Sequence, residues 1–164
     1  MKKLISLLLI FALALTFASS AFAVSANPAV PAVKEKVIHT EYYSDGSYAK
    51  LVVAEGMSSS DGTRATQTKS GTKGWIFYNA NGVQLWKVQI TGTFSYTGST
   101  STCTGVTKAT FIYNSAWKVT AESCSKSSNK ALGSFTVKRY TLLVPVQTEN
   151  VSLTLTCSAN GTLS

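Results

Sequence analysis

The chain of 164 residues carries 15 basic and 7 acidic side chains, and 45% of its residues are hydrophobic while only 13% are charged. This composition excludes a disordered polyelectrolyte, and the length predicts one domain rather than several. A chain of this size buries roughly two thirds of its extended surface on folding, which is enough for one hydrophobic core.

The first 23 residues have the pattern of an export signal. Lys2 and Lys3 give a positive start, residues 4–17 are apolar without a charge, and residues 21–23 read Ala-Phe-Ala, the small-residue pattern of a signal peptidase site. The apolar run is shorter than the roughly 20 residues that a membrane span needs. We therefore expect cleavage after Ala23, secretion, and no transmembrane segment in the mature chain.

Removal of this signal also removes two lysines, so the mature chain keeps 13 basic and 7 acidic residues, a net charge of +6. Residues 24–34 contain two of the three prolines and no hydrophobic alternation, which predicts an extended N-terminal tail. Residues 35–164 then form the folded domain.

Turn-forming residues divide this domain into strands. Asn81-Gly82, the preferred pair for a tight hairpin turn, separates residues 74–78 from the strand 83–96, and Ser44-Asp45-Gly46 separates residues 36–43 from residues 47–55. Residues 57–71 are polar and predict a surface loop. Residues 125–130 predict a second one. The remaining expected strands cover residues 106–113, 117–124, 132–140 and 151–157.

Within these strands the hydrophobic pattern has a period of two, and no helical repeat is present. Val151, Leu153, Leu155 and Cys157 alternate with Ser and Thr, as in a strand with one buried face. In the strand 83–96 the alternation that begins at Trp86 is interrupted by Gly92, where we expect a bend as the strand passes between two sheets.

About eight strands at this spacing predict an all-β, single-domain antiparallel β-sandwich, with an immunoglobulin-like Greek key as one option. Trp117 lies between Cys103 and Cys157, as a tryptophan does in immunoglobulin domains. Leu155, however, stands where that family has a tyrosine, so the order of these residues supports a sandwich and not that family.

Exported chains commonly form disulfides, and three cysteines can form one disulfide and leave one free thiol. Cys157 lies in the apolar phase of its strand, and Cys103 is in phase with Phe111 if no bulge intervenes, whereas Cys124 is in phase with Lys118. We therefore expect a disulfide between Cys103 and Cys157. Pairing of Cys103 with Cys124, or three free thiols, stay open as alternatives.

The residues that could perform catalysis are few and scattered. His39 is the only histidine, and no second histidine or paired-cysteine motif accompanies it to form a metal site. The chain therefore predicts no enzyme, no cofactor and no metal, although a small secreted hydrolase with paired carboxylates is not excluded. The carboxylates are Glu35, Glu41, Asp45, Glu55, Asp61, Glu122 and Glu149.

The basic excess is the main functional signal. We expect Arg64, Lys69, Lys126 and Lys130, in two loops, to contact an anionic cell-surface polymer. Another secreted or surface protein is the alternative partner, and specific nucleic-acid binding is not expected. The simplest interpretation of the basic residues is that their charge keeps the domain soluble and protects its sheet edges from pairing with other molecules.

Aromatic residues give a second option, a carbohydrate-binding module. Trp75, Tyr78, Trp86 and Trp117 could stack on sugars, but the apolar phase of Trp86 and Trp117 favours the core. A toxin or pore-like protein with long Thr-rich strands is a third option.

Three segments carry a family resemblance: residues 43–48 (Tyr-Ser-Asp-Gly-Ser-Tyr), residues 82–94 with residues 101–103, and residues 153–161 (Leu-Thr-Leu-Thr-Cys-Ser-Ala-Asn-Gly). In these segments the chain resembles small exported all-β proteins of unknown function from Gram-positive bacteria. The resemblance implies bacterial origin and secretion, and it assigns no functional residue. The sequence thus favours a secreted, non-catalytic binding protein.

Overall fold

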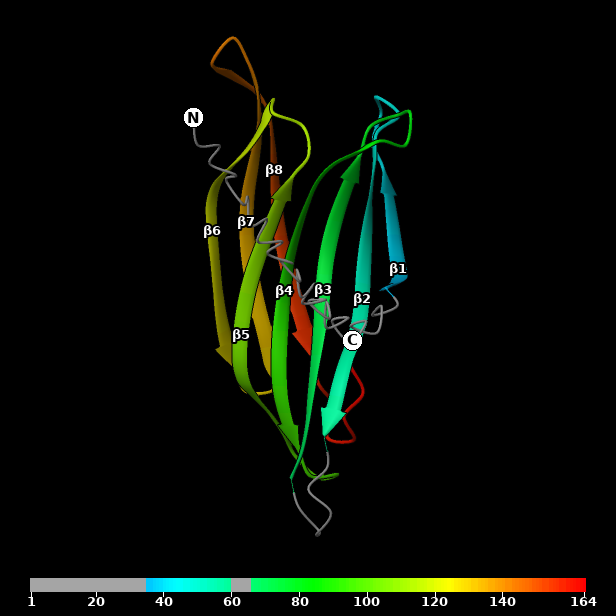
Figure 1. The fold of residues 1–164 in the computed structure, drawn as a ribbon, viewed down its shortest axis with the longest axis vertical. Helices are drawn as coiled ribbons and strands as arrows, with labels where there is room; N and C mark the ends of the chain where they lie inside the picture. Colours follow the sequence, from blue (N-terminus) through cyan, green and yellow to red (C-terminus); the bar gives the residue numbers. More distant parts are fainter. Residues whose placement is uncertain (1–34, 60–65) are drawn as a thin grey trace, which may run out of the picture. The chain divides into compact units, whose positions relative to one another are not determined.

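The computed structural model describes residues 35–59 and 66–164, which fold as an all-β sandwich of eight antiparallel strands. The expected signal, the tail and Arg64 lie outside the described residues. One sheet has the order β1-β2-β3-β4-β5 and the other β6-β7-β8 (Figure 1). The strands are β1 (Glu35–Tyr42), β2 (Tyr48–Ser59), β3 (Gln67–Tyr78), β4 (Gln84–Tyr96), β5 (Ser101–Ile112), β6 (Trp117–Ser127), β7 (Lys130–Thr141) and β8 (Val144–Thr156).

The strands of each sheet are neighbours in the sequence as well as in space, so each sheet is a meander. The Greek-key option is therefore not realised. The two hairpin turns expected first are present, and Gly46 and Gly82 adopt the positive φ values of 81° and 77° that such turns require. Within the described residues no helix is long and apolar enough to cross a membrane.

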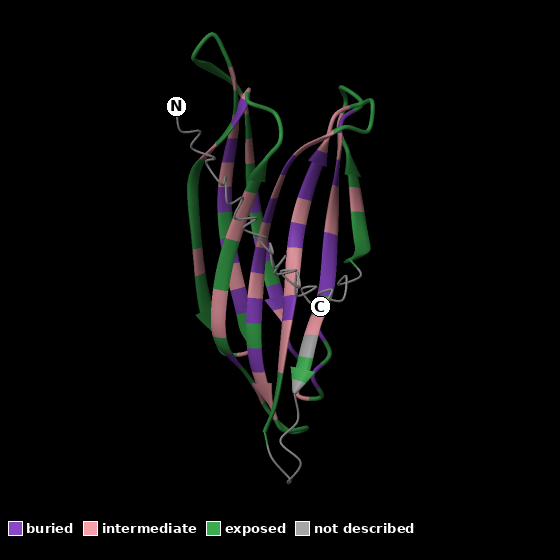
Figure 2. Ribbon diagram, in the orientation of Figure 1, coloured by how far each residue is buried: buried purple, intermediate pink, exposed green. Residues whose placement is uncertain are grey.

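The core lies between the sheets and follows the alternation seen in the sequence. Val151, Leu153, Leu155 and Cys157 are all buried, and buried residues alternate with more exposed ones along the strands (Figure 2). Trp86 and Trp117 are 0% and 3% exposed and pack on Phe77, so their expected place in the core is confirmed. The strand phase therefore identified the buried face correctly in these elements.

Two β-bulges change the phase that the sequence suggested. Thr104 is an extra residue in β5, so Cys103 faces the core although Phe111, expected in the same phase, is 41% exposed. Thr120 is an extra residue in β6, which places Cys124 opposite Gly133 on the inward side of the sheet. The assignment of Cys124 to the outward phase was therefore wrong, because a bulge exchanges the two faces of a strand.

All three cysteines are free thiols in the structure, so the expected bond between Cys103 and Cys157 is not formed in it. Their sulfur atoms contact local carbonyl oxygens instead, Cys103 at 3.3 Å from Gly105 and Cys157 at 3.4 Å from Ser158. Burial raises the pKa of the Cys103 thiol, which keeps it protonated at neutral pH.

Gly92 marks a close approach and not a crossing between sheets. The strand β4 pairs only within the five-stranded sheet, so the expected passage is wrong. A Cβ at Gly92 would lie 2.7 Å from the Phe94 ring and 2.9 Å from the Cβ of Ala131 in β7. The missing side chain lets the two sheets touch at this point.

Several strands are longer than their hydrophobic pattern. The expected loop 57–71 is strand at both ends, where Ser58 pairs with Lys69 and Ser59 with Thr68; residues 60–65 lie outside the described part. The expected loop 125–130 contracts to a turn at residues 128–129. These strand ends consist mostly of polar residues, so they carry no hydrophobic alternation to detect.

The two sheets are of unequal width, and this creates an open side. β3 packs on β8 and β4 on β7, whereas the backbones of β1 and β2 come close to no strand of the three-stranded sheet. The inner face of β1 and β2 therefore extends beyond β8, as the right-hand strands of Figure 1 show. The space beside β8 under this extension is the side groove.

Candidate functional site

The side groove contains two cavities that follow one another along β8. The lower cavity, of about 810 Å³, is lined by Lys36, Ile38, Val53, Glu55, Lys73, Thr154, Thr156, Thr162, Leu163 and Ser164. The upper cavity, of about 290 Å³, is lined by Glu41, Tyr43, Trp75, Glu149, Asn150, Val151 and Ser152. Each takes its walls from both sheets.

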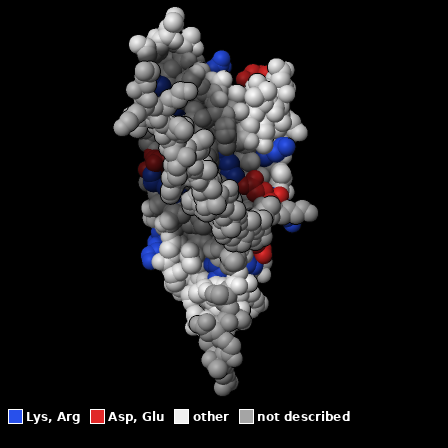
Figure 3. All heavy atoms as spheres, viewed as in Figure 1, with Lys and Arg blue, Asp and Glu red and all other residues white. Residues whose placement is uncertain are grey.

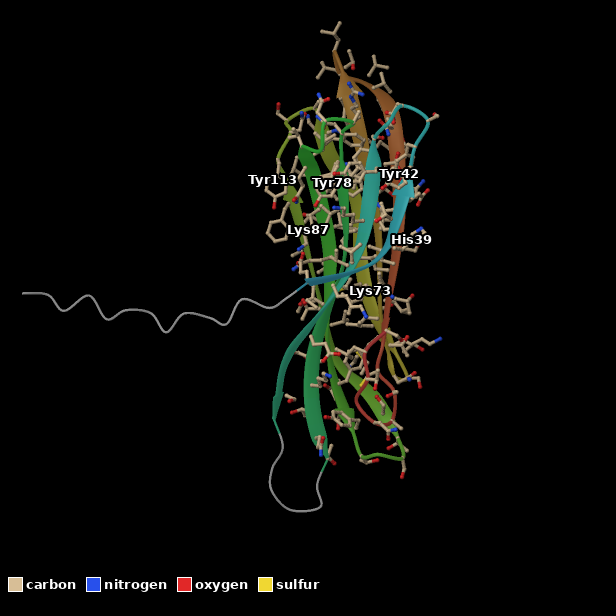
Figure 4. All side chains as sticks on the ribbon, turned by 90° about the vertical axis from the view of Figure 1, so that its right-hand side faces the viewer. His39, Tyr42, Lys73, Tyr78, Lys87 and Tyr113 are labelled. Carbon is tan, nitrogen blue, oxygen red and sulfur yellow. The ribbon has the colours of Figure 1, made fainter. Side chains whose placement is uncertain are left out.

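Strand pairing places two lysines in the lower cavity. Lys36 pairs with Val53, and Val53 pairs with Lys73, so these three residues form one row across β1, β2 and β3. Residues paired directly across strands share a face, and Ile90, the partner of Lys73 on β4, is in the core. Lys73 therefore points inward between the sheets, as Figure 4 shows from the open side.

Within the described part of the chain, the ammonium groups of Lys36 and Lys73 have no carboxylate partner. The three ion pairs of the described residues are Lys69 with Glu55, Lys87 with Glu35, and Lys108 with Glu122, and they leave out Lys36 and Lys73. Desolvation lowers the pKa of Lys73 from its ordinary value, because burial disfavours the charged form. The carboxylate of Glu55, the one acidic side chain that lines this cavity, is held 2.8 Å from the Lys69 ammonium. The lower cavity therefore suits a negatively charged group.

The upper cavity has the opposite charge. Glu41 and Glu149 both line it, beside the rings of Tyr43 and Trp75. Burial raises the pKa of Tyr43 to about 12, with further contributions from Glu149, Glu41 and Asp45. The Trp75 indole N–H is buried without a hydrogen-bond partner. A cavity that combines aromatic rings with two carboxylates suits a cationic group of a ligand.

The backbone edge of β8 opens into the same groove. At its end, Thr156 and Ser164 exchange two backbone hydrogen bonds of 2.9 and 3.0 Å, and Ser158 N–H donates to the Thr162 carbonyl at 2.8 Å. Because backbone groups alternate in direction along a strand, those of Asn150, Ser152 and Thr154 point to the same side. In the described part of the chain no strand pairs with them there.

The basic residues singled out from the sequence are only partly brought together. Lys69, Lys126 and Lys130 lie toward one end of the sandwich, but in strands and not in loops. The Lys69 ammonium is paired with Glu55, and that of Lys126 donates to the Thr104 carbonyl at 2.6 Å. On the face in Figure 3, basic and acidic side chains are interspersed.

Two of the aromatic rings outside the core, Tyr48 and Tyr78, are half-buried. Tyr48 and Tyr78 stack on each other on the outer face of the five-stranded sheet, with centroids 4.8 Å apart and planes at 12°. Lys50 lies 5.5 and 5.2 Å from these two ring centroids. One face of each ring is thus occupied by the other ring, and Trp86 and Trp117 are in the core.

His39 lies on β1, exposed, near the open side (Figure 4). Among residues 35–59 and 66–164, no three His, Cys, Asp or Glu side chains gather to hold a metal ion. Of the scattered carboxylates, the structure places Glu41 and Glu149 together in the upper cavity.

Comparisons with known proteins provide no assignment. No model of a protein family matches the chain, and neither the curated proteins nor the solved structures give a match. The resemblance to small exported Gram-positive proteins therefore stays a prediction.

Proposed function

We propose that this chain is a secreted, non-catalytic interaction domain that binds an extended segment of another protein in the side groove. The observation that carries the proposal is the free edge of β8, whose lower end already pairs with residues 162–164 of the same chain. A peptide that adds to such an edge gains backbone hydrogen bonds, and pockets along the edge select its side chains.

The width of the sheets supports strand addition at this place. A further strand beside β8 would lie opposite the inner face of β1 and β2, where Leu51 is half-buried and Val53, 8% exposed, belongs to the core. Alternate side chains of the added strand would then face the apolar inward row of β2 and the polar inward row of β1, which contains Lys36, His39 and Glu41. The ligand would add a strand to the smaller sheet and would cover the half-buried Leu51.

The charges of the two cavities specify the ligand further. The lower cavity lies beside Thr154 and the upper one beside Asn150, a separation of about four residues or roughly 13 Å along a strand. Residues four apart in the ligand strand share a face. A strand antiparallel to β8 would thus place an acidic residue opposite Lys36 and Lys73, followed four residues later by a basic one near Glu41 and Glu149.

This ligand can be tested with fluorescent peptides of alternating Thr and Val that carry one Glu and, four residues later, one Lys. We expect binding by fluorescence anisotropy, loss of binding when the ligand backbone is N-methylated at alternate residues, and weaker binding when Glu and Lys are exchanged. Lys73→Glu should weaken binding about tenfold or more, because it places like charges together.

The matched control is the double substitution Lys126→Glu and Lys130→Glu, which reverses two exposed charges outside the groove. Binding of the peptide should change by no more than about twofold, as expected for exposed charges. If this variant alone lost binding, and an anionic polymer competed with the peptide, the basic end of the sandwich would be the site instead.

For the secreted form we also propose the bond between Cys103 and Cys157. Their backbone N–H groups donate to the adjacent carbonyls of Ser128 and Asn129, at 2.7 and 3.1 Å, so the two cysteines flank one turn. Non-reducing peptide mapping of protein from the medium should find this pair, with Cys124 open to alkylation. Three alkylated cysteines in the unfolded, unreduced protein would contradict the bond.

A further inference from the structure

The turn between β7 and β8 carries the two most exposed large hydrophobic side chains of the described residues. Leu142 and Leu143 are 93% and 87% exposed, and Val144 and Val146 follow at 60% and 56%. The hairpin extends beyond the neighbouring turns at its end of the sandwich, and it is exposed throughout its tip (Figures 1 and 2). These residues form the leucine tip. Its side chains contribute nothing to the core.

The backbone of the leucine tip is strained. Leu142 and Leu143 have φ values of 49° and 70°, in the left-handed region that bulky side chains rarely adopt. At the other positive-φ positions of the described residues the chain has glycine, as at Gly46 and Gly82, or the small polar residue Ser128. An Asn-Gly pair would form the same turn without strain or exposed apolar surface. Two leucines here therefore weaken the fold, which points to a role in contact with something outside the chain.

The side chains below the tip are aromatic and basic. Lys118 and Lys138 pair across β6 and β7, and the Lys118 ammonium lies 5.5 Å from the centroid of the Tyr140 ring. Arg139 lines a separate cavity together with Asp45 and therefore does not belong to this basic group. From the tip of the hairpin toward the body of the sandwich, the side chains are thus first aliphatic, then aromatic and then cationic.

This order matches the layers of an anionic membrane surface. Aliphatic side chains gain from burial among acyl chains, tyrosine rings favour the interface, and lysines reach negatively charged headgroups. We propose that the leucine tip inserts Leu142 and Leu143 into the surface of an anionic lipid bilayer, with Tyr140, Lys118 and Lys138 at the headgroups. This contact is independent of the side groove, and it would hold the domain at a membrane while the groove binds its ligand.

The test uses protein recovered from the medium of a secreting host, so that wild type and variants share one N-terminus. Vesicles of phosphatidylcholine with phosphatidylglycerol should sediment the wild type, and vesicles of phosphatidylcholine alone should sediment less of it. The double substitution Leu142→Asn with Leu143→Gly should reduce partitioning about tenfold or more, because two buried leucines are lost. Its melting temperature should be equal or higher, since the strain is removed. Lys118→Glu with Lys138→Glu should abolish the preference for anionic vesicles.

Two further variants keep the result interpretable. Phe111→Ser removes an exposed apolar side chain from β5 and should leave vesicle binding unchanged. Leu143→Trp places a fluorophore in the tip, whose emission should shift to the blue on addition of anionic vesicles and be quenched by brominated lipid. Equal sedimentation of the Asn-Gly variant and the wild type, absence of the blue shift, or a lower melting temperature of the Asn-Gly variant would overturn the proposal.

Discussion

Trp86→Ala should lower the free energy of unfolding by about 3 to 5 kcal/mol, the range for truncation of a large buried aromatic residue. The side chain is 0% exposed and stacks on Phe77 with planes at 2° and centroids 5.2 Å apart. Trp117, from the other sheet, packs on the same pair at 5.8 Å from Trp86. Removal of the indole therefore opens a cavity in the aromatic cluster that joins the two sheets.

Urea denaturation followed by circular dichroism measures this loss. Because small domains are stable by only about 5 to 15 kcal/mol, the expected loss is a large part of the total. Tyr113→Ala is the matched control, since that ring is 60% exposed, and it should cost within about 1 kcal/mol. A loss below 1 kcal/mol for Trp86→Ala would contradict its place in the core. If this variant does not fold, Trp86→Phe should fold with a smaller loss.

Much of the fold could be predicted from the sequence because alternation reports which face of a strand is buried. The positions of Trp86 and Leu155 followed from it directly. Alternation cannot detect a bulge, however, and one extra residue at Thr120 reversed the expected orientation of Cys124. The turn at Leu142 and Leu143 was missed for a different reason, because leucines are not turn-forming residues and the chain adopts the turn against their preference.

The side groove could not be predicted, because alternation does not show which sheet a strand joins. Glu41 and Glu149 lie more than 100 residues apart in the sequence, and they share a cavity because β1 is an edge of one sheet and β8 an edge of the other. One signal was present at Lys73, which shares the inward phase of Trp75 and Phe77. A lysine in the buried phase of a strand is unusual enough to indicate a cavity.

The distance between the sheets depends on two glycines, Gly92 and Gly133, at the contact between β4 and β7. A Cβ at Gly133 would overlap the Cγ2 of Ile90 and lie 3.1 Å from the Phe135 ring. Ile90 and Phe135 are 0% and 1% exposed, so neither can move away into solvent. Gly133→Ala should therefore lower the free energy of unfolding by about 1 to 3 kcal/mol, the usual cost of overpacking a core.

Gly105→Ala is the matched control for this substitution. It also adds one methyl group to a strand, but its Cβ would lie 3.8 Å from Thr93, an ordinary contact. Because alanine lowers the conformational entropy of the unfolded chain, Gly105→Ala should be neutral or slightly stabilising. Equal effects of the two substitutions in urea denaturation would show that strand glycines as such set the stability. A loss of stability at Gly133 alone would show that the close approach of the two sheets at Ile90 sets the stability. The same close approach determines how far β8 lies from the inner face of β1 and β2, and thus the width of the side groove.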